Sequence, residues 1–213
     1  MLLFEDKVPN NKDAFIRKVI DVSAKLDILP NWLMAVMNSE TGGTFSPFIV
    51  NPNGGATGLI QFMPRTATDL GTTTAELAHM SNVKQLDYVL KYFYDFRNYI
   101  NSYEDLYLIT FYPNADRKFA STLSKPDNWK FPYAVYAQNS GIDKDGKGYI
   151  TIADFRKFAY AKLTPEARKL INESTGALVT SKKFVLRNKV PIAIISICFI
   201  LSGILLIQSS KKK

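Results

Sequence analysis

The sequence predicts a mainly α-helical protein that has one folded domain and a separate apolar segment near its C-terminus. Apolar residues recur at helical spacing over residues 13–25 and 83–101. The chain has 213 residues, of which 46% are hydrophobic, and this is enough for one core. Its 11 Gly and 10 Pro are too few for a fibrous or disordered chain. We therefore place a single helical domain at residues 1–162.

The helices of this domain have recognisable starts and stops. Helix-breaking pairs follow the first two helices, at Leu29-Pro30 and at Gly42-Gly43. Residues 44–57 are rich in Pro, Asn, Gly and Thr, which predicts an irregular loop or a short, poorly regular hairpin. A third helix begins near Pro64, because proline is tolerated in a first turn. The predicted helices span residues 13–25, 31–39, 64–71, 83–101, 105–112, 133–138 and 152–162.

The C-terminal part differs from the domain in charge and hydropathy. Residues 1–155 carry 15 Lys and Arg against 17 Asp and Glu, whereas residues 156–213 carry 12 against 2. The basic surplus therefore belongs to the tail, which argues against a nucleic-acid partner. Residues 190–207 form an uncharged apolar run with basic residues on both sides, and this pattern predicts a transmembrane helix in contact with lipid headgroups. A helix buried in a protein assembly is the alternative.

We accordingly expect residues 164–181 to form a short amphipathic helix followed by a small-residue linker, STGALVTS, both within a basic linker, residues 163–189. The span, 190–207, and a basic tail, 208–213, follow. The flanking charges do not decide the orientation of this single-pass anchor. The N-terminus lacks the basic and apolar regions of a secretory signal. The lone Cys198 excludes an intrachain disulfide, and the lone His79 argues against a zinc site or a Ser-His-Asp hydrolase.

Glu40 is the first candidate catalytic residue. It ends an apolar helix, where the free carbonyl groups and the negative end of the helix dipole disfavour a carboxylate. No Lys or Arg occurs between Lys25 and Arg65 to offset this effect. If Glu40 faces a partly apolar cleft, its pKa should be raised and it could serve as a general acid. An exposed glutamate at a helix end is the structural alternative.

The segment that follows Glu40 resembles the soluble lytic transglycosylase family of lysozyme-like enzymes. The matching features are Glu40-Thr41, the string Gly-Leu-Ile-Gln-Phe-Met-Pro at residues 58–64, then Thr66-Ala67 and Leu70-Gly71. The resemblance is densest over residues 28–71. It implies a lysozyme-like fold of the goose-type and lytic transglycosylase kind, and glycan strands of peptidoglycan as the substrate. It implies no cofactor for catalysis.

The resemblance also suggests residues that bind the substrate. Thr41 and Gly58 stand at motif positions, and Gln61 and Phe62 are expected to contact the sugar through an amide and an aromatic ring. The family's later Tyr-Asn-Ala-Gly string is only partly kept. Its tyrosine corresponds best to Tyr112, although residues 138–141 are a second candidate for the string.

The reaction depends on whether a second carboxylate is present. Glycosidases that hydrolyse with water usually pair two carboxyl groups about 5 to 10 Å apart. Residues 41–68 contain neither Asp nor Glu, although Asp69, Asp105 or Asp116 could fold back toward Glu40. A lone glutamate fits the family's non-hydrolytic cleavage between N-acetylmuramic acid and N-acetylglucosamine. A hydrolytic muramidase on the same fold and a non-catalytic, membrane-anchored virion structural protein are the alternatives.

Residues 143–154 resemble the calcium loop of an EF-hand. Gly148 stands at the sixth position, where the chain must turn sharply, and Lys147 replaces the usual fifth ligand. The expected calcium ligands are Asp143, Asp145, Tyr149 through its carbonyl, Thr151 and Asp154. Because the lysine opposes a cation, we expect any calcium site here to be weak and structural.

A membrane span without a secretory signal would keep the domain on the side where it is made, away from peptidoglycan. A bacteriophage particle that contains a membrane would resolve this conflict. We therefore expect the chain in a virion membrane, beside other virion proteins, where it would act on the host cell envelope.

Overall fold

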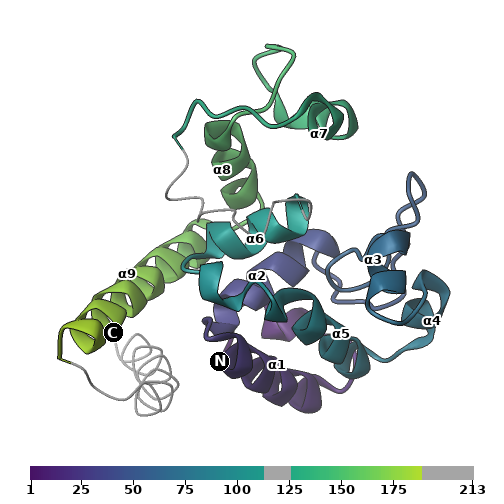
Figure 1. Ribbon diagram of the computed structural model, residues 1–213. Coiled ribbons are helices and arrows are strands. Elements are labelled where there is room, and N and C mark those ends of the chain that lie inside the picture. The colour runs from purple at the N-terminus through teal and green to yellow at the C-terminus, as the bar shows by residue number, and fades with distance from the viewer. Residues whose placement is uncertain (113–125, 189–213) are drawn as a thin grey trace.

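The computed structural model describes residues 1–112 and 126–188 and is mainly helical. In Figure 1 the helices α1 to α6 form the body, α7 and α8 follow on one side of it, and α9 extends away. The α-helices are α1 Lys12–Leu26, α2 Pro30–Glu40, α3 Pro64–Asp69, α4 Thr74–His79, α5 Asn82–Tyr94, α6 Tyr103–Phe111, α7 Tyr133–Gln138, α8 Ile152–Ala161 and α9 Pro165–Asn188. Short 3-10 helices lie at η1 Glu5–Lys7, η2 Arg97–Tyr99 and η4 Ser140–Ile142.

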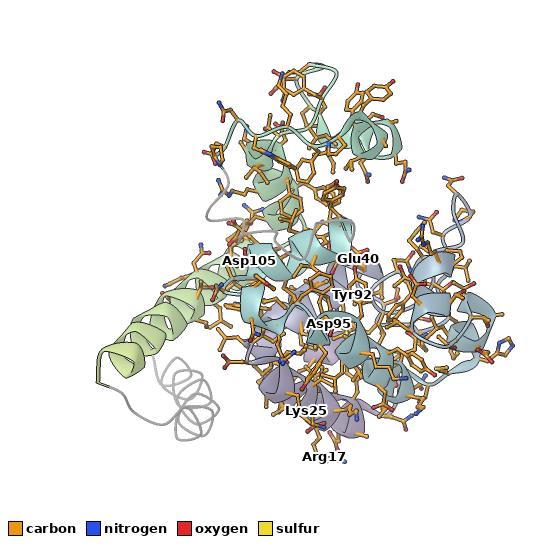
Figure 2. The ribbon with its side chains drawn as sticks, in the orientation of Figure 1. Arg17, Lys25, Glu40, Tyr92, Asp95 and Asp105 are labelled. Atoms are coloured by element: carbon orange, nitrogen blue, oxygen red, sulfur yellow. The ribbon has the colours of Figure 1, made fainter. Side chains whose placement is uncertain are left out.

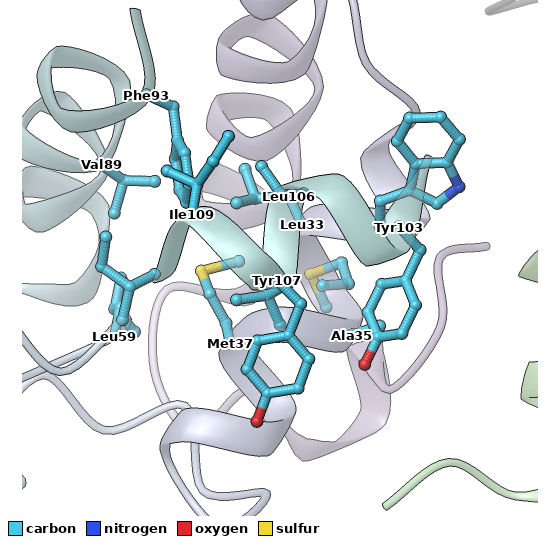
Figure 3. Packing of buried hydrophobic residues seen from close by; sticks show 14 of the residues in the cluster. Leu33, Ala35, Met37, Leu59, Val89, Phe93, Tyr103, Leu106, Tyr107 and Ile109 are labelled. Atoms are coloured by element: carbon cyan, nitrogen blue, oxygen red, sulfur yellow. The ribbon is translucent and has the colours of Figure 1, made fainter. Parts of the chain in front are cut away.

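Helix α2 is the centre of the core. Every residue from position 31 to 39 is buried, as expected for a helix that is apolar on all sides. Helix α1 packs against α2 and α5, and α6 crosses the other side of α2. Figure 3 shows side chains of α2, α5 and α6 meeting in this cluster, among them Leu33, Met37, Phe93 and Leu106. The last residue of α2, Glu40, therefore follows directly after the buried centre of the domain.

The segment between α2 and α3 is the irregular hairpin that its composition predicts. Isolated antiparallel bridges join Val50 to Thr57 and Thr57 to Phe62, without regular strands. This confirms the sequence prediction. The Gly-Leu-Ile-Gln string, residues 58–61, forms the turn between Thr57 and Phe62.

Most of the predicted helices are confirmed within a few residues of their ends. Helix α7 has the expected bounds, whereas α5 stops at Tyr94 and is followed by the 3-10 helix η2. Helix α4 was not predicted. Its signal is a capping box, in which Thr73 and Glu76 exchange hydrogen bonds between side chain and backbone.

The C-terminal part corrects the predicted linker. Residues 165–188 form the single helix α9, so the expected short helix and small-residue linker are continuous. Thr175, within the segment that we expected to be non-helical, donates its hydroxyl to the carbonyl of Ile171 one turn earlier. The small residues there do not break the helix. Intrinsic helix propensity is a weak determinant, and the surrounding structure can override it.

The prediction of a transmembrane helix, and with it a single-pass localisation in a virion membrane, is corrected. No helix within residues 1–112 and 126–188 combines the length and the apolar character that a bilayer span requires. Helix α9 is long enough, but it carries Glu166, Arg168, Lys169 and Glu173 in its first half. The expected span, 190–207, and tail, 208–213, lie outside the described residues.

Candidate active site

Glu40 lies at the C-terminal end of α2 and is half-buried. Figure 2 shows it in the helical body, with Tyr92 nearby. The last turn of α2 has no basic residue, as the sequence analysis noted. Burial is the largest influence on the Glu40 carboxyl group and raises its pKa. A carboxyl group in these surroundings keeps its proton to a higher pH than an exposed glutamate does.

Tyr107 of α6 is hydrogen-bonded to Glu40. The phenol oxygen of Tyr107 also lies 2.8 Å from Oγ of Ser39, which is buried. The Tyr107 bond lowers the pKa of Glu40, so the phenol stabilises the carboxylate. A phenol has one proton, and both contacts are satisfied when the Ser39 hydroxyl donates to Tyr107 and Tyr107 donates to Glu40. This pair connects the end of α2 to α6 and fixes the carboxyl group.

Three buried phenols lie within the electrostatic influence of the Glu40 carboxyl group and remain protonated. Burial raises the pKa of Tyr92, Tyr103 and Tyr107, and the negative charge of Glu40 raises each further. Figure 3 shows that the hydroxyls of Tyr103 and Tyr107, one helical turn apart on α6, point the same way. These phenols are therefore neutral and do not compete with Glu40 for its proton.

Thr41 closes α2, and its side chain turns inward. Its hydroxyl donates to the carbonyl of Met37 at 2.7 Å and accepts from the backbone N–H of Phe45 at 3.0 Å. The residue is 2% exposed. In this structure Thr41 fixes the turn after the glutamate, and its expected contact with substrate stays a prediction.

Gly58 lies against a buried side chain of the protein, whereas the resemblance suggested a contact with substrate. Its φ of 80° is in the left-handed region, and a Cβ atom there would overlap the side-chain amide of Gln85. Gln85 is fully buried and accepts from the N–H of Leu59 at 3.0 Å. Its amide also donates to the carbonyls of Pro47 and Leu77, at 2.9 and 2.7 Å. The glycine thus admits a protein side chain, and sequence reasoning missed Gln85 because a glutamine within a helical pattern gives no sign of burial.

Gln61 has the exposure expected of a residue that binds sugar. It is half-buried, and its φ of 52° is unusual for a residue with a side chain. Its amide nitrogen donates to the carbonyl of Gly58 at 3.1 Å, while Oε1 accepts no hydrogen bond from the described residues. Strained backbone of this kind is concentrated at functional sites.

Phe62 points the opposite way, into the core. The ring is 2% exposed and packs edge-on against Tyr92, with centroids 6.2 Å apart. Of these two neighbours, Gln61 stays half-buried whereas Phe62 is buried. This placement does not fit the expected stacking of Phe62 on a sugar; the ring supports Tyr92 beside Glu40.

The tyrosine that bonds to Glu40 is Tyr107, five residues before the expected Tyr112. Tyr112 follows the last turn of α6 and packs edge-on against Phe131, with centroids 5.9 Å apart. Five residues turn an α-helix by well over one revolution, so the two side chains leave α6 in different directions. Asn139, from the second candidate string, donates to Val135 within the α7 turn.

The candidates for a second acid that the structure describes lie on other helices than Glu40. Asp105 is buried near the start of α6 and accepts from the backbone N–H of Asn101 at 2.9 Å. Asp69 is exposed at the end of α3, and Asp116 lies outside the described residues. The side chains that shift the pKa of Glu40 are Tyr107 and Lys162, and neither is a carboxylate.

The EF-hand-like loop is closed by a lysine. The ammonium group of Lys147 lies 3.3 Å from Asp143, 3.4 Å from Asp145 and 2.9 Å from Asp154. These bonds hold the pKa of Lys147 above its usual range. Within the described ranges, no group of three or more His, Cys, Asp or Glu is arranged to hold a metal ion. In this structure an ammonium group lies among the carboxylates that were expected to bind calcium, and calcium binding here stays a prediction.

The other two predicted ligands complete the loop. Thr151 and Asp154 form a capping box at the start of α8, where one carboxylate oxygen of Asp154 accepts both the N–H and the hydroxyl of Thr151. The ring of Tyr149 lies 3.7 Å from the ammonium of Lys130. The carboxylates expected to bind calcium are therefore engaged with protein groups.

Comparison with known proteins gives one match. The model of the transglycosylase SLT domain matches residues 18–148, well over half of the chain. This range contains Glu40, the hairpin and Tyr107. No curated protein and no solved structure matches the chain. The half-buried glutamate at the end of α2 lies inside the matched range. The chain belongs to the transglycosylase SLT domain family, whose members are lytic transglycosylases acting on peptidoglycan.

Proposed function

We propose that the chain cleaves the β-1,4 bond between N-acetylmuramic acid and N-acetylglucosamine with Glu40 as its single acid and base. The observation that supports this most directly is the half-buried Glu40, whose pKa is raised by burial and whose carboxylate is stabilised by Tyr107. The opposing influences suit a group that must give up a proton and later take one back.

In the first step the Glu40 carboxyl group donates its proton to the bridging oxygen, and the bond from the muramic C1 atom to that oxygen breaks. The acetamido group of the substrate stabilises the positive charge that develops at C1. The Glu40 carboxylate then removes the proton of the C6 hydroxyl, and O6 bonds to C1. The products are a free N-acetylglucosamine end and a 1,6-anhydromuramic end, and Glu40 is protonated again without consuming water.

The test is cleavage of purified peptidoglycan by wild type and Glu40→Gln, with mass spectrometry of the products. We expect turnover to fall by at least about a hundredfold, a typical contribution of a general acid. Wild-type products should end in anhydromuramic acid, lighter by one water than hydrolytic products. Glu173→Gln, the same change at an exposed position of α9, is the matched control and should leave turnover unchanged.

The outcomes separate the alternatives. Hydrolytic ends from wild type would favour a muramidase, and wild-type turnover by Glu40→Gln would exclude Glu40 as the acid. A chain that binds peptidoglycan without cleaving it would be a binding protein. Association with a bacteriophage particle and its proteins stays a prediction, which detection of the chain in purified particles would test.

A further inference from the structure

Lys162 brings a positive charge to the glutamate from a distant part of the chain. It follows the last residue of α8, and its ammonium group donates to the carbonyl of Ser39 at 3.4 Å. The two residues are 123 positions apart in the sequence. Ser39 immediately precedes Glu40, at the end of α2 where carbonyl groups lack helical partners. The lysine therefore binds the helix end that carries the proposed acid.

A contact with an aromatic ring limits where the ammonium group of Lys162 can lie. The ammonium of Lys162 also lies 5.3 Å from the centroid of the Phe158 ring, one turn earlier on α8. Phe158 itself packs against Tyr107, with centroids 5.9 Å apart. Lys162 and the phenol that bonds to Glu40 are thus supported by the same aromatic ring.

The other titratable groups near this end of α2 are three neutral phenols and Lys7, whose ammonium group donates to Asn38 at 3.3 Å. The charge of Glu40 raises the pKa of Tyr103 and Tyr107 on α6 and of Tyr92 on α5, beyond the larger effect of burial. The charge of Lys162 acts against burial and lowers the pKa of Glu40. Residues 26–64 contain no Lys or Arg, so the positive charge of Lys162 reaches this helix end from a segment distant in the sequence.

We propose that Lys162 is a positioning residue that stabilises the carboxylate of Glu40 between its proton donation and its proton uptake. This inference rests on the proposed function of Glu40. Without Lys162, the carboxylate formed in the first step would lose the positive charge that offsets burial and the negative end of α2. Glu40 would then be a weaker acid, and the first step would slow.

The test measures the titration of Glu40 directly, by NMR of the full chain with labelled glutamate and with Glu40→Gln to assign the signal. In Lys162→Met the pKa of Glu40 should rise, whereas Lys162→Arg should keep it near the wild-type position. Because Lys162 is exposed, the difference should shrink as salt is added. Lys169→Met, which removes the same charge from an exposed position on α9, should leave the titration unchanged.

Cleavage kinetics provide the second measurement. The alkaline limb of kcat/KM should move to higher pH in Lys162→Met, and kcat on the plateau should fall severalfold. An unchanged Glu40 titration in folded Lys162→Met would overturn the proposal, as would a rise in KM alone, which would indicate that Lys162 binds substrate. Wild-type activity of Glu40→Gln would instead overturn the proposed function, whatever the result for Lys162.

Discussion

At Glu40, catalysis and stability make opposite demands on one carboxyl group. Burial raises its pKa, while Tyr107 and Lys162 lower it, and burial is the larger effect. An acid with a raised pKa in the folded state binds its proton more tightly there than in the unfolded chain. Its contribution to stability is therefore greatest at low pH and declines as the pH rises above the unfolded value, near 4.5, toward the folded one.

This predicts that Glu40→Gln is more stable than wild type at neutral pH, because the neutral amide avoids the cost of a half-buried charge. Below about pH 4 wild type is protonated in both states, and the advantage should shrink. Urea denaturation of both proteins at pH 4 and pH 7 measures the difference. A Glu40→Gln protein whose advantage is larger at pH 4 than at pH 7 would show that burial does not dominate at this site.

At the scale of single elements, the loop before α8 shows how a lysine side chain can take the place of a bound cation. The loop keeps the positions of Asp143, Asp145, Gly148 and Asp154 from the EF-hand pattern. Lys147 joins the three carboxylates from within the chain, where an EF-hand uses a cation from solution. The wild-type loop therefore has little need of calcium to hold its shape.

Lys147→Asp should convert this loop into a calcium-dependent one. The change removes the ammonium group and adds a carboxylate at the fifth position, so the variant should be less stable than wild type without calcium. Calcium should restore stability, by about 2.7 kcal/mol at a hundred times the dissociation constant. Thermal melts with and without calcium measure this, and magnesium should do less.

Wild type should respond to calcium less than Lys147→Asp does. A wild-type response as large as that of the variant would mean that Lys147 leaves the loop when calcium binds. If neither protein responds, the loop is a turn without metal affinity.

At the scale of the whole molecule, α8 belongs to the active domain although the matched family range ends at residue 148. Phe155 of α8 is fully buried, with its ring centroid 6.0 Å from that of Tyr107 and 5.2 Å from that of Phe111. The hydroxyl of Tyr103 donates to the carbonyl of Ala159 at 2.8 Å. Helix α8 therefore packs against α6, the helix that supplies Tyr107.

Phe155→Ala should lower the free energy of unfolding by about 3–5 kcal/mol, because it leaves a cavity behind α6. Activity should fall at temperatures where the variant is still folded, since Tyr107 loses a packing partner. Phe48→Ala, at a ring that is 58% exposed, is the control and should change stability by less than about 0.5 kcal/mol. Equal effects of the two substitutions on the unfolding midpoint would contradict this account of α8.

The sequence by itself determined the helical class, most helix positions, the irregular hairpin and the place of Glu40 at a helix end. These features depend on residues close together in the chain, where apolar periodicity, prolines and glycines act locally. The same local reasoning missed α4 and placed a linker inside α9, because propensities are weak at the ends of elements. It also predicted a membrane helix that the described part of the chain does not contain.

The tertiary structure alone decided which side chains surround Glu40. Tyr107 meets Ser39 across 68 residues and Lys162 meets it across 123, and no local pattern in one sequence encodes such pairs. The choice of Tyr107 over Tyr112 follows from the face of α6 that packs on α2. The burial of Phe62 and the approach of Gln85 to Gly58 follow from the same packing. The sequence therefore supplied the acid, and the packing of α2, α5, α6 and α8 supplied the groups that adjust its affinity for a proton.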